Sequence, residues 1–228
     1  MTAVAPLHAL IAGDGDGPDR ARLDAAWPGW DDDVRLVVAA DGGARLAERL
    51  GLRIDHWVGD GDSLDSVAIE RLRQSGIPVD LVSPAKDESD LELALGRAVA
   101  LGATRVTILG ALGGQRLDHT LANVALLAHP ALAGRDACLL DAATRVSLVT
   151  GPATARIDGR RGDLVSLLPV SGDVAGITTE GLEYSLHDEP LVIGPARGLS
   201  NVRLGTTASV TVRTGRLLVV EVPATLGP

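Results

Sequence analysis

The chain has 228 residues, of which 46% are hydrophobic, so it is long enough for one large or two small domains with a buried core. Its net charge of −9 argues against a nucleic-acid partner, because binding to a phosphate backbone rests on clustered lysine and arginine. The sequence holds no run of 18 apolar residues, no basic segment precedes its short apolar start, and it contains one cysteine, Cys138. We therefore expect no membrane span, no export and a cytoplasmic location.

Short apolar runs alternate with amphipathic stretches over the first part of the chain. The apolar runs predict strands at 7–13, 35–40, 55–59, 78–83, 104–110 and 136–141. The amphipathic stretches predict helices at 42–51, 63–76, 89–102 and 117–129. Continuous apolar strands separated by helices favour a parallel, doubly wound sheet with both faces covered. We therefore expect residues 1–142 to form an α/β domain.

The helical pattern is absent from residue 143 onwards. Short segments of β type are separated by Gly, Pro and Asp turns, at 145–149, 154–157, 164–170, 208–214 and 216–222. The pair Thr214-Gly215 between the last two segments predicts a hairpin. We expect residues 143–228 to form a smaller all-β domain, antiparallel and sandwich-like.

Three acidic loops follow strand ends in the first domain. They read AADGGA, VGDGDSLD and KDESD, and they contain Asp41, Asp60, Asp62 and Asp90. Ligands of a doubly wound sheet bind beyond the carboxyl ends of its strands, so these carboxylates are expected to converge. Mg²⁺ prefers such hard oxygen ligands.

An alternative is that these residues only make turns and helix caps. Asp62 or Ser63 would then cap the helix at 63–76, and Ser89 with Glu92 would form a capping box. Both interpretations can hold together, because a helix N-terminus is also where phosphates bind.

A fourth loop precedes the helix at 117–129. Gly113 and Gly114 would let the backbone approach a phosphate, Arg116 offers a guanidinium fork, and Asp118 can cap the helix. The alternatives are that Asp118 is only a cap and that Asn123 is an exposed polar residue of the helix. The sequence has no GxxxxGK[ST] motif, which excludes a Walker-type ATPase.

Rare residue types mark further positions. Lys86 is the only lysine among 21 basic residues, and Tyr184 is the only tyrosine. In a chain biased towards arginine, a lysine is expected to persist chiefly where a compact ammonium cannot be replaced by a guanidinium. Chance survival is the alternative.

Five motifs in this order resemble the thiamin pyrophosphokinase family: DGGA, GDxDSL, KDxSD, GGxRxDH, and a late GLEY with SN. The resemblance covers nearly the whole chain. It implies a catalytic, nucleotide-binding domain at 1–142, a domain for thiamin binding and dimerisation at 143–228, and a homodimer with thiamin sites between subunits. It also implies that ATP and thiamin react with the help of Mg²⁺ to give AMP and thiamin diphosphate.

The resemblance assigns roles residue by residue. The catalytic group is Asp41, Asp60, Asp62 and Asp90, and the last three would bind Mg²⁺. ATP and its phosphates would be held by Ser63, Lys86, Ser89, Gly113, Gly114, Arg116, Asp118 and Asn123. The thiamin site would be lined by Tyr184, Ser200 and Asn201. The chain departs from the family pattern at Gly61, where Phe is frequent, and at Arg116, which stands one place later than usual.

Two other functions fit parts of the sequence. DGDS resembles the DxDx[ST] nucleophile loop of Mg²⁺-dependent phosphohydrolases of the haloacid dehalogenase class, although that loop normally follows the first strand and Asp60 follows about the third. The other alternative is a dimeric nucleotide-binding regulator without turnover. This alternative predicts ligand-dependent binding of a partner and no formation of AMP.

Overall fold

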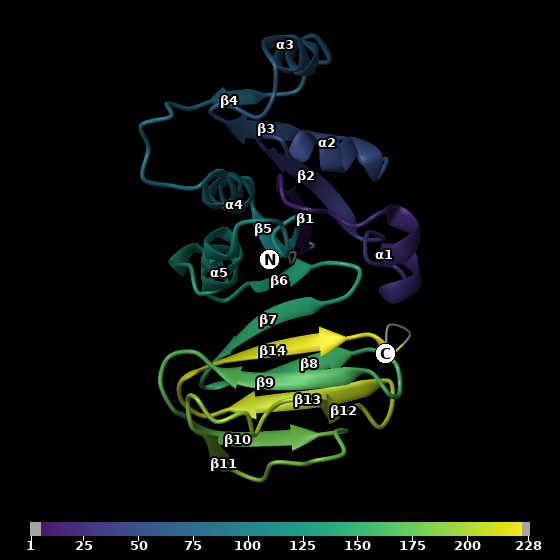
Figure 1. Ribbon diagram of the computed structural model, residues 1–228, viewed down its shortest axis with the longest axis vertical. Coiled ribbons are helices and arrows are strands. Elements are labelled where there is room, and N and C mark those ends of the chain that lie inside the picture. Colours follow the sequence, from purple (N-terminus) through teal and green to yellow (C-terminus); the bar gives the residue numbers. More distant parts are fainter. Residues whose placement is uncertain (1–5, 225–228) are drawn as a thin grey trace, which may run out of the picture. The chain divides into compact units, whose positions relative to one another are not determined.

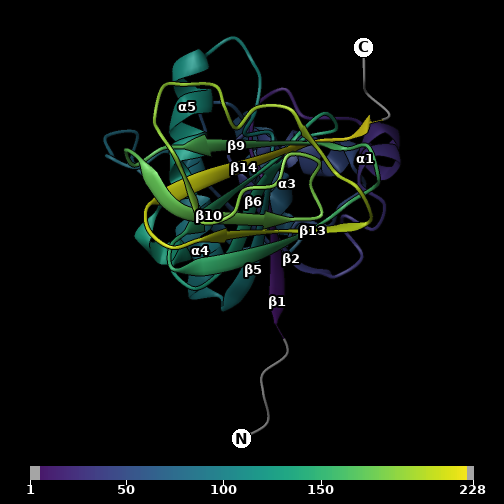
Figure 2. The same ribbon diagram turned by 90° about the horizontal axis from the view of Figure 1, so that it is seen from below.

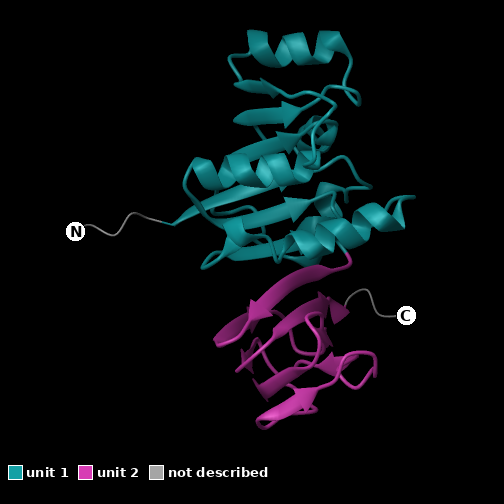
Figure 3. Ribbon diagram, turned by 90° about the vertical axis from the view of Figure 1, so that its left-hand side faces the viewer, with its two compact units in different colours: residues 1–142 teal, residues 143–228 magenta. Residues whose placement is uncertain are grey.

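The computed structural model describes residues 6–224, and the chain divides into two compact units, Met1–Ala142 and Ala143–Pro228 (Figure 1; Figure 3). None of the helices in the described residues is both long enough and apolar enough to cross a bilayer.

The first unit is built on a sheet with the strand order β6-β5-β1-β2-β3-β4. Every neighbouring pair is parallel. The strands are β1 (Leu7–Ala12), β2 (Val34–Ala40), β3 (His56–Gly59), β4 (Val79–Leu81), β5 (Ala103–Leu109) and β6 (Asp136–Leu140). The helices are α1 (Arg20–Ala26), α2 (Gly43–Arg49), α3 (Ser66–Gln74), α4 (Asp90–Ala100), α5 (Leu117–Leu126) and the short 3₁₀ turn η1 (Pro130–Leu132). This confirms the predicted α/β class.

Helices cover both faces of this sheet (Figure 1). Leu10 of β1 packs in one cluster with Leu23 of α1 and Leu46 of α2. Ile11 points to the opposite face by strand alternation, is fully buried, and lies on the side where α4 contacts β1, β2, β3 and β5. Burial on both faces explains why these strands are continuous apolar runs.

Helix α1 was not predicted from the sequence. It has seven residues and buries only Leu23 and Ala26, so its apolar pattern is too short to show a helical period. The Asp19 side chain accepts a hydrogen bond from Arg22 N at 2.8 Å and caps the helix.

The second unit contains two antiparallel sheets, ordered β12-β9-β14-β7 and β11-β10-β13-β8. Figure 2 labels one neighbouring pair of each sheet, β9 with β14 and β10 with β13. Their strands are β7 (Arg145–Thr150), β8 (Ala153–Asp158), β9 (Leu164–Pro169), β10 (Val174–Glu180), β11 (Glu189–Leu191), β12 (Asn201–Val202), β13 (Thr207–Val212) and β14 (Arg216–Val222). Apolar residues of both sheets share one buried cluster, as in a sandwich. The predicted antiparallel β class of this unit is therefore confirmed.

The predicted hairpin at Thr214-Gly215 is wrong. Strand β13 pairs with β8 and β10, whereas β14 pairs with β7 and β9, so the chain changes sheet at this turn. Val212 and Leu217 on either side of the turn lie in the same core. Strands β13 and β14 thus pack face to face across the core, whereas in a hairpin they would be hydrogen-bonded neighbours in one sheet.

A charged network lies inside the second unit. The Arg203 side chain is fully buried and donates to Glu221 Oε2 at 2.6 Å. Arg145 donates to both oxygens of the same carboxylate, at 2.7 and 2.8 Å. Glu221 is therefore a buried anion held between two guanidinium groups, and removing one partner of such a group is costly.

We predict that Arg203→Met lowers the stability of the second unit by about 3 kcal/mol, because Met fills much of the space but leaves Glu221 with one cation. Differential scanning calorimetry measures the effect. The matched control is Arg156→Met, since Arg156 forms an exposed pair with Asp158 and its loss should leave the melt unchanged. Equal melting temperatures for the two variants would contradict the role of the network.

Candidate functional site

A cavity of about 810 Å³ opens in the first unit beside the carboxyl ends of its strands. Its lining comes from loops that follow β1, β2, β3, β4 and β5 and from the start of α4 and α5. Lining residues that were predicted from the sequence are Asp41, Asp60, Asp62, Ser63, Lys86, Ser89, Asp90, Gly113, Gly114, Arg116 and Asn123. The structure thus brings together residues that span about 80 positions of the chain, as expected for a parallel sheet.

Three carboxylates meet at the edge of this cavity. One oxygen from each of Asp41, Asp60 and Asp62 lies within 4.8 Å of the others. Oxygens around one Mg²⁺ ion lie about 3 to 4 Å apart, since each is about 2.1 Å from the metal. A small closure of the loop after β3 would therefore give three ligands for one divalent cation.

The environment of Asp41 supports a cation at this place. Its side chain is buried, with the residue only 2% exposed, and its Oδ2 accepts a hydrogen bond from Ser63 N at 3.1 Å. Its Oδ1 has no hydrogen-bond partner among residues 6–224. A buried carboxylate oxygen without a donor is unfavourable, and a metal ion bound by the neighbouring carboxylates would satisfy it. The residues present fit a divalent metal.

Lys86 links the carboxylate group to α4. Its Nζ donates to Asp90 Oδ1 at 2.7 Å and to Asp60 Oδ2 at 3.0 Å, and its side chain is mostly buried. The hydrogen bond from Lys86, followed by that from Asp62 N, holds the pKa of Asp60 below its ordinary value. Burial alone would lower the pKa of Lys86, but the bonds to Asp90 and Asp60 outweigh it and raise that pKa. The pair is therefore fully charged at neutral pH.

Asp90 lies on the far side of this lysine. Asp41, Asp60 and Asp62 form the described group of three carboxylates, and Asp90 is joined to it through the ammonium of Lys86. Its assignment as a metal ligand stays a prediction.

The loop before α5 has the open backbone that was expected of a phosphate-binding loop. Gly113 and Gly114 have φ values of +81° and +83°, which favour glycine, and nothing lies within 4 Å of where a Cβ would stand. Asn123 donates to Ala111 O at 2.9 Å and fixes the start of the loop. Asn123 is therefore more than an exposed polar residue of the helix.

Two predicted caps are wrong. Helix α3 begins at Ser66 and is capped by Asp65, which accepts from Ala68 N at 2.7 Å, so neither Asp62 nor Ser63 caps it. Both are instead left at the cavity, where Ser63 N contacts Asp41. A sequence rich in Asp and Ser offers several possible caps, and the pattern alone does not choose among them.

Asp118 does not cap α5 either. The cap position is Arg116, and no side-chain hydrogen bond caps this described helix. Asp118 accepts from Arg116 Nε at 3.0 Å, and this bond lowers the pKa of Asp118 to about 2. The predicted capping box at Ser89 is confirmed in one half: Ser89 Oγ accepts from Glu92 N at 3.2 Å, whereas the Glu92 carboxylate lies 3.5 Å from His129 Nε2.

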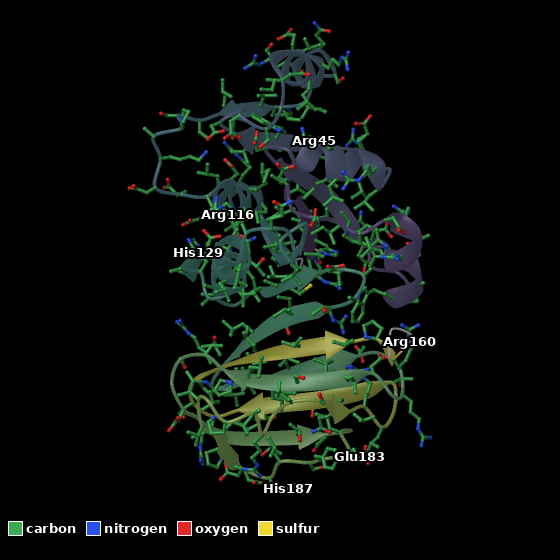
Figure 4. The ribbon with its side chains drawn as sticks, viewed as in Figure 1. Arg45, Arg116, His129, Arg160, Glu183 and His187 are labelled. Atoms are coloured by element: carbon green, nitrogen blue, oxygen red, sulfur yellow. The ribbon has the colours of Figure 1, made fainter. Side chains whose placement is uncertain are left out.

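The loop after β1 also lines the cavity, which was not predicted from the sequence. Asp14 and Asp16 of this loop line the cavity, and Asp14 accepts a hydrogen bond from Arg45 Nη2 at 3.2 Å. Arg45, which projects from α2 (Figure 4), also donates to Ser63 O at 2.7 Å. It ties the loop after β1 to the loop after β3. The signal was the acidic segment GDGDG directly after the first strand.

The residues assigned to thiamin lie in the second unit. The Tyr184 side chain projects outward, with the residue 67% exposed. Asn201 is buried, and its amide accepts from Tyr184 N at 3.0 Å and from Val202 N at 2.9 Å and donates to Tyr184 O at 2.7 Å. These bonds turn the amide towards its own chain, so Asn201 holds the segment that presents Tyr184.

Ser200 has a left-handed backbone, with φ of +56°. Its N–H donates to Ser166 Oγ at 3.0 Å, and Gly198 O accepts from Leu167 N at 2.8 Å. Non-glycine residues in this conformation are strained and persist where surrounding bonds fix them, often at functional sites. The segment 198–201 is therefore rigidly fastened to β9.

Two family models match the chain. One is described as "Thiamin pyrophosphokinase, catalytic domain" and matches residues 30–139, and the other as "Thiamin pyrophosphokinase, vitamin B1 binding domain" and matches residues 154–219. The thiamine pyrophosphokinase of Bacillus subtilis strain 168 is 24% identical over 194 residues, which are 85% of this chain and 90% of that protein.

Solved structures of similar proteins share the fold. The thiamine pyrophosphokinase structure from Bacillus subtilis has a TM-score of 0.79 at 23% identity, covering 95% of this chain and 99% of that one. The thiamin pyrophosphokinase from Geobacillus thermodenitrificans has 0.78 at 28% identity, covering 95% and 97%. The enzyme from Candida albicans has 0.76 at 14% identity, covering 95% and 89%.

We predict that Asn201→Ala frees the Tyr184 segment, because three hydrogen bonds are lost. Tyr184 is the only tyrosine, so protein labelled with 3-fluorotyrosine gives one ¹⁹F resonance to follow. The resonance should sharpen and move towards the position of the free amino acid. Asn201→Asp keeps the acceptor for two N–H groups and should give an intermediate spectrum, whereas an unchanged spectrum for the alanine variant would contradict the clamp.

Proposed function

Because the chain belongs to the thiamin pyrophosphokinase family, we propose that it transfers the pyrophosphoryl group of ATP to the hydroxyl of thiamin, giving thiamin diphosphate and AMP. The observation that carries the proposal is the group formed by Asp41, Asp60 and Asp62 at the edge of a large cavity. It lies in the part of the chain that matches the catalytic model, and a part that matches the vitamin B1 model follows.

The two units have separate tasks in this proposal. Residues 1–142 bind ATP and the metal, and residues 143–228 bind thiamin and take part in dimerisation. The exposed ring of Tyr184 offers an aromatic face for the thiamin cation. Ser200 directly precedes Asn201, whose amide is bonded to the backbone of Tyr184.

In the reaction, the thiamin hydroxyl attacks the β-phosphorus of ATP in line. A new oxygen–phosphorus bond forms, the bond from the β-phosphorus to the oxygen of the α-phosphate breaks, AMP leaves, and the hydroxyl proton passes to water or to a carboxylate of the cluster. Such transfers gain chiefly from alignment and charge stabilisation. The protein therefore needs to position two substrates and to balance the charge of the triphosphate.

A divalent metal and one lysine would provide that balance. Asp41, Asp60 and Asp62, with Asp90 next to them, would hold the Mg²⁺, which would supply positive charge against the phosphate oxygens. In the resting protein the ammonium of Lys86 neutralises Asp60 and Asp90. With ATP bound, this compact cation would lie within reach of a phosphate oxygen, and Asp60 would be free to act as a metal ligand.

The remaining cavity residues contact the nucleotide. Gly113 and Gly114 bring backbone N–H groups to the phosphates, and Arg116 exchanges Asp118 for a phosphate oxygen. The hydroxyl groups of Ser63 and Ser89 lie at the same cavity.

Helix α5 supports a homodimer. Within the described chain it is a ten-residue helix without a single buried residue, although Leu117 and Leu121 lie one turn apart on one side. An apolar helix face exposed to this extent marks an interaction surface. Arg116 directly precedes the helix and lines the cavity. A second copy of the chain bound to α5, in a cytoplasmic homodimer, would therefore cover one side of the catalytic site.

The direct test is incubation with thiamin, ATP and Mg²⁺, followed by chromatography. We expect thiamin diphosphate and AMP in equal amounts, and no product after the metal is removed with EDTA. Release of free phosphate would favour the phosphohydrolase, ADP would indicate a simple kinase, and binding without any product would favour the regulator. Each of these results contradicts the proposed function.

We predict that Lys86→Arg lowers kcat/KM for ATP by about 10- to 100-fold, because the broad guanidinium cannot occupy the place of a compact ammonium between Asp60 and Asp90. The KM for thiamin should stay unchanged. The matched control is Arg71→Lys on the exposed side of α3, which also exchanges a guanidinium and an ammonium group, but away from the cavity. Normal use of ATP by the Lys86 variant would show that the lysine has no phosphate partner.

A further inference from the structure

Asp41 has a conformation that needs support. Its φ of +43° is left-handed, a conformation that is strained for a residue with a side chain. Its N–H donates to Val58 O at 2.8 Å, and its carbonyl accepts from Ala44 N at 3.2 Å. Its carboxylate accepts from Ser63 N, while the buried Oδ1 keeps an unmatched lone pair among the described residues. The direction of this carboxylate therefore depends on how firmly the backbone is held.

Trp57 supplies a further bond to this backbone. The residue is fully buried in β3, and its indole Nε1 donates to Asp41 O at 3.0 Å. Indole has a single donor and no acceptor, so a buried tryptophan directs its ring towards a fixed carbonyl. Gly59, two residues along the strand, packs against Asp41 so closely that a Cβ would come within 2.8 Å of the Asp41 Cβ. Strand β3 thus presses and bonds Asp41 from one side.

Trp57 also belongs to the hydrophobic cluster that lies behind the loop of Asp60 and Asp62. Trp57 packs in one cluster with Leu64, which follows the loop of Asp60 and Asp62, and with Ile69 of α3. One buried side chain therefore bonds the backbone of Asp41 and shares a hydrophobic cluster with the segment that follows Asp60 and Asp62. Neither contact reaches the cavity, because Trp57 has no exposed surface.

We propose that Trp57 is a positioning residue for the carboxylate group: its indole N–H holds Asp41 in the left-handed conformation and so directs the buried Oδ1 at a divalent cation shared with Asp60 and Asp62. The inference rests on the proposed metal-dependent function, but it concerns binding of the metal alone. Residues that orient metal ligands from behind typically contribute 10- to 100-fold to metal affinity.

The test is the variant Trp57→Phe, which keeps an aromatic ring and removes the N–H. Mn²⁺ binding, measured by electron paramagnetic resonance without ATP or thiamin, should weaken about 10-fold. In turnover, the Mg²⁺ concentration for half-maximal rate should rise, while kcat at saturating Mg²⁺ recovers most of its value. Asp62→Asn, which removes a ligand itself, should lose both Mn²⁺ binding and turnover.

Trp27→Phe is the matched control. Its indole N–H likewise donates to a backbone carbonyl of the first unit, that of Asp141 at 2.7 Å, and its ring is buried in a different cluster. It should cost similar stability in a thermal melt and leave Mn²⁺ affinity unchanged. Equal Mn²⁺ affinity of the folded Trp57 and Trp27 variants would overturn the proposal.

If Trp57→Phe does not fold, benzothienylalanine replaces Trp57 in a chain that carries Trp27→Phe and Trp30→Phe. Its sulfur takes the place of the N–H in a ring of nearly the same shape, so only the hydrogen bond is lost. Normal Mn²⁺ binding by this protein would again exclude the role of the N–H. Because Mn²⁺ binding needs no substrate, a wild-type protein that binds Mn²⁺ but forms no thiamin diphosphate would contradict the proposed function alone.

Discussion

Mutual repulsion of carboxylates at one edge of a parallel sheet is the constraint on which the first unit depends. Parallel strands deliver their following loops to the same edge, so Asp41, Asp60 and Asp62 are brought within 4.8 Å of one another. Like charges at such a distance repel one another unless a cation is close. The ammonium of Lys86 provides one cation within the chain. The buried Asp41 Oδ1, which has no hydrogen-bond partner in the described part of the chain, leaves room for another.

That constraint explains why the supporting structure is stiff. Arg45 joins two of the converging loops through Asp14 and the Ser63 carbonyl, and Trp57 bonds the strained backbone of Asp41 from the core. Loops held in this way cannot relax apart when the site is empty. Many ordinary contacts around the site offset the cost of repulsion, so that only a small closure of the loop after β3 is left for a bound cation to bring about.

The alternation of apolar runs predicted the parallel strands of the first unit, and with them the convergence of Asp41, Asp60 and Asp62. Periodicity reports burial, and burial on both faces is what this sheet imposes. It could not tell Asp65 from Asp62 as the cap of α3, because both carry the same side chain. Nor could it show that β13 and β14 part at Gly215, since the choice of partner depends on contacts between distant segments. The inward turn of the Asn201 amide has no local signal at all.

The buried indoles have an optical consequence. Trp27, Trp30 and Trp57 all belong to the first unit, where each is shielded from water. The second unit contains the only tyrosine, already exposed in the folded state, and the chain has no phenylalanine. A red shift of the emission on adding urea therefore follows the opening of the α/β unit. Unfolding of the β sandwich, including loss of its buried Arg203–Glu221 pair, would hardly change the tryptophan emission.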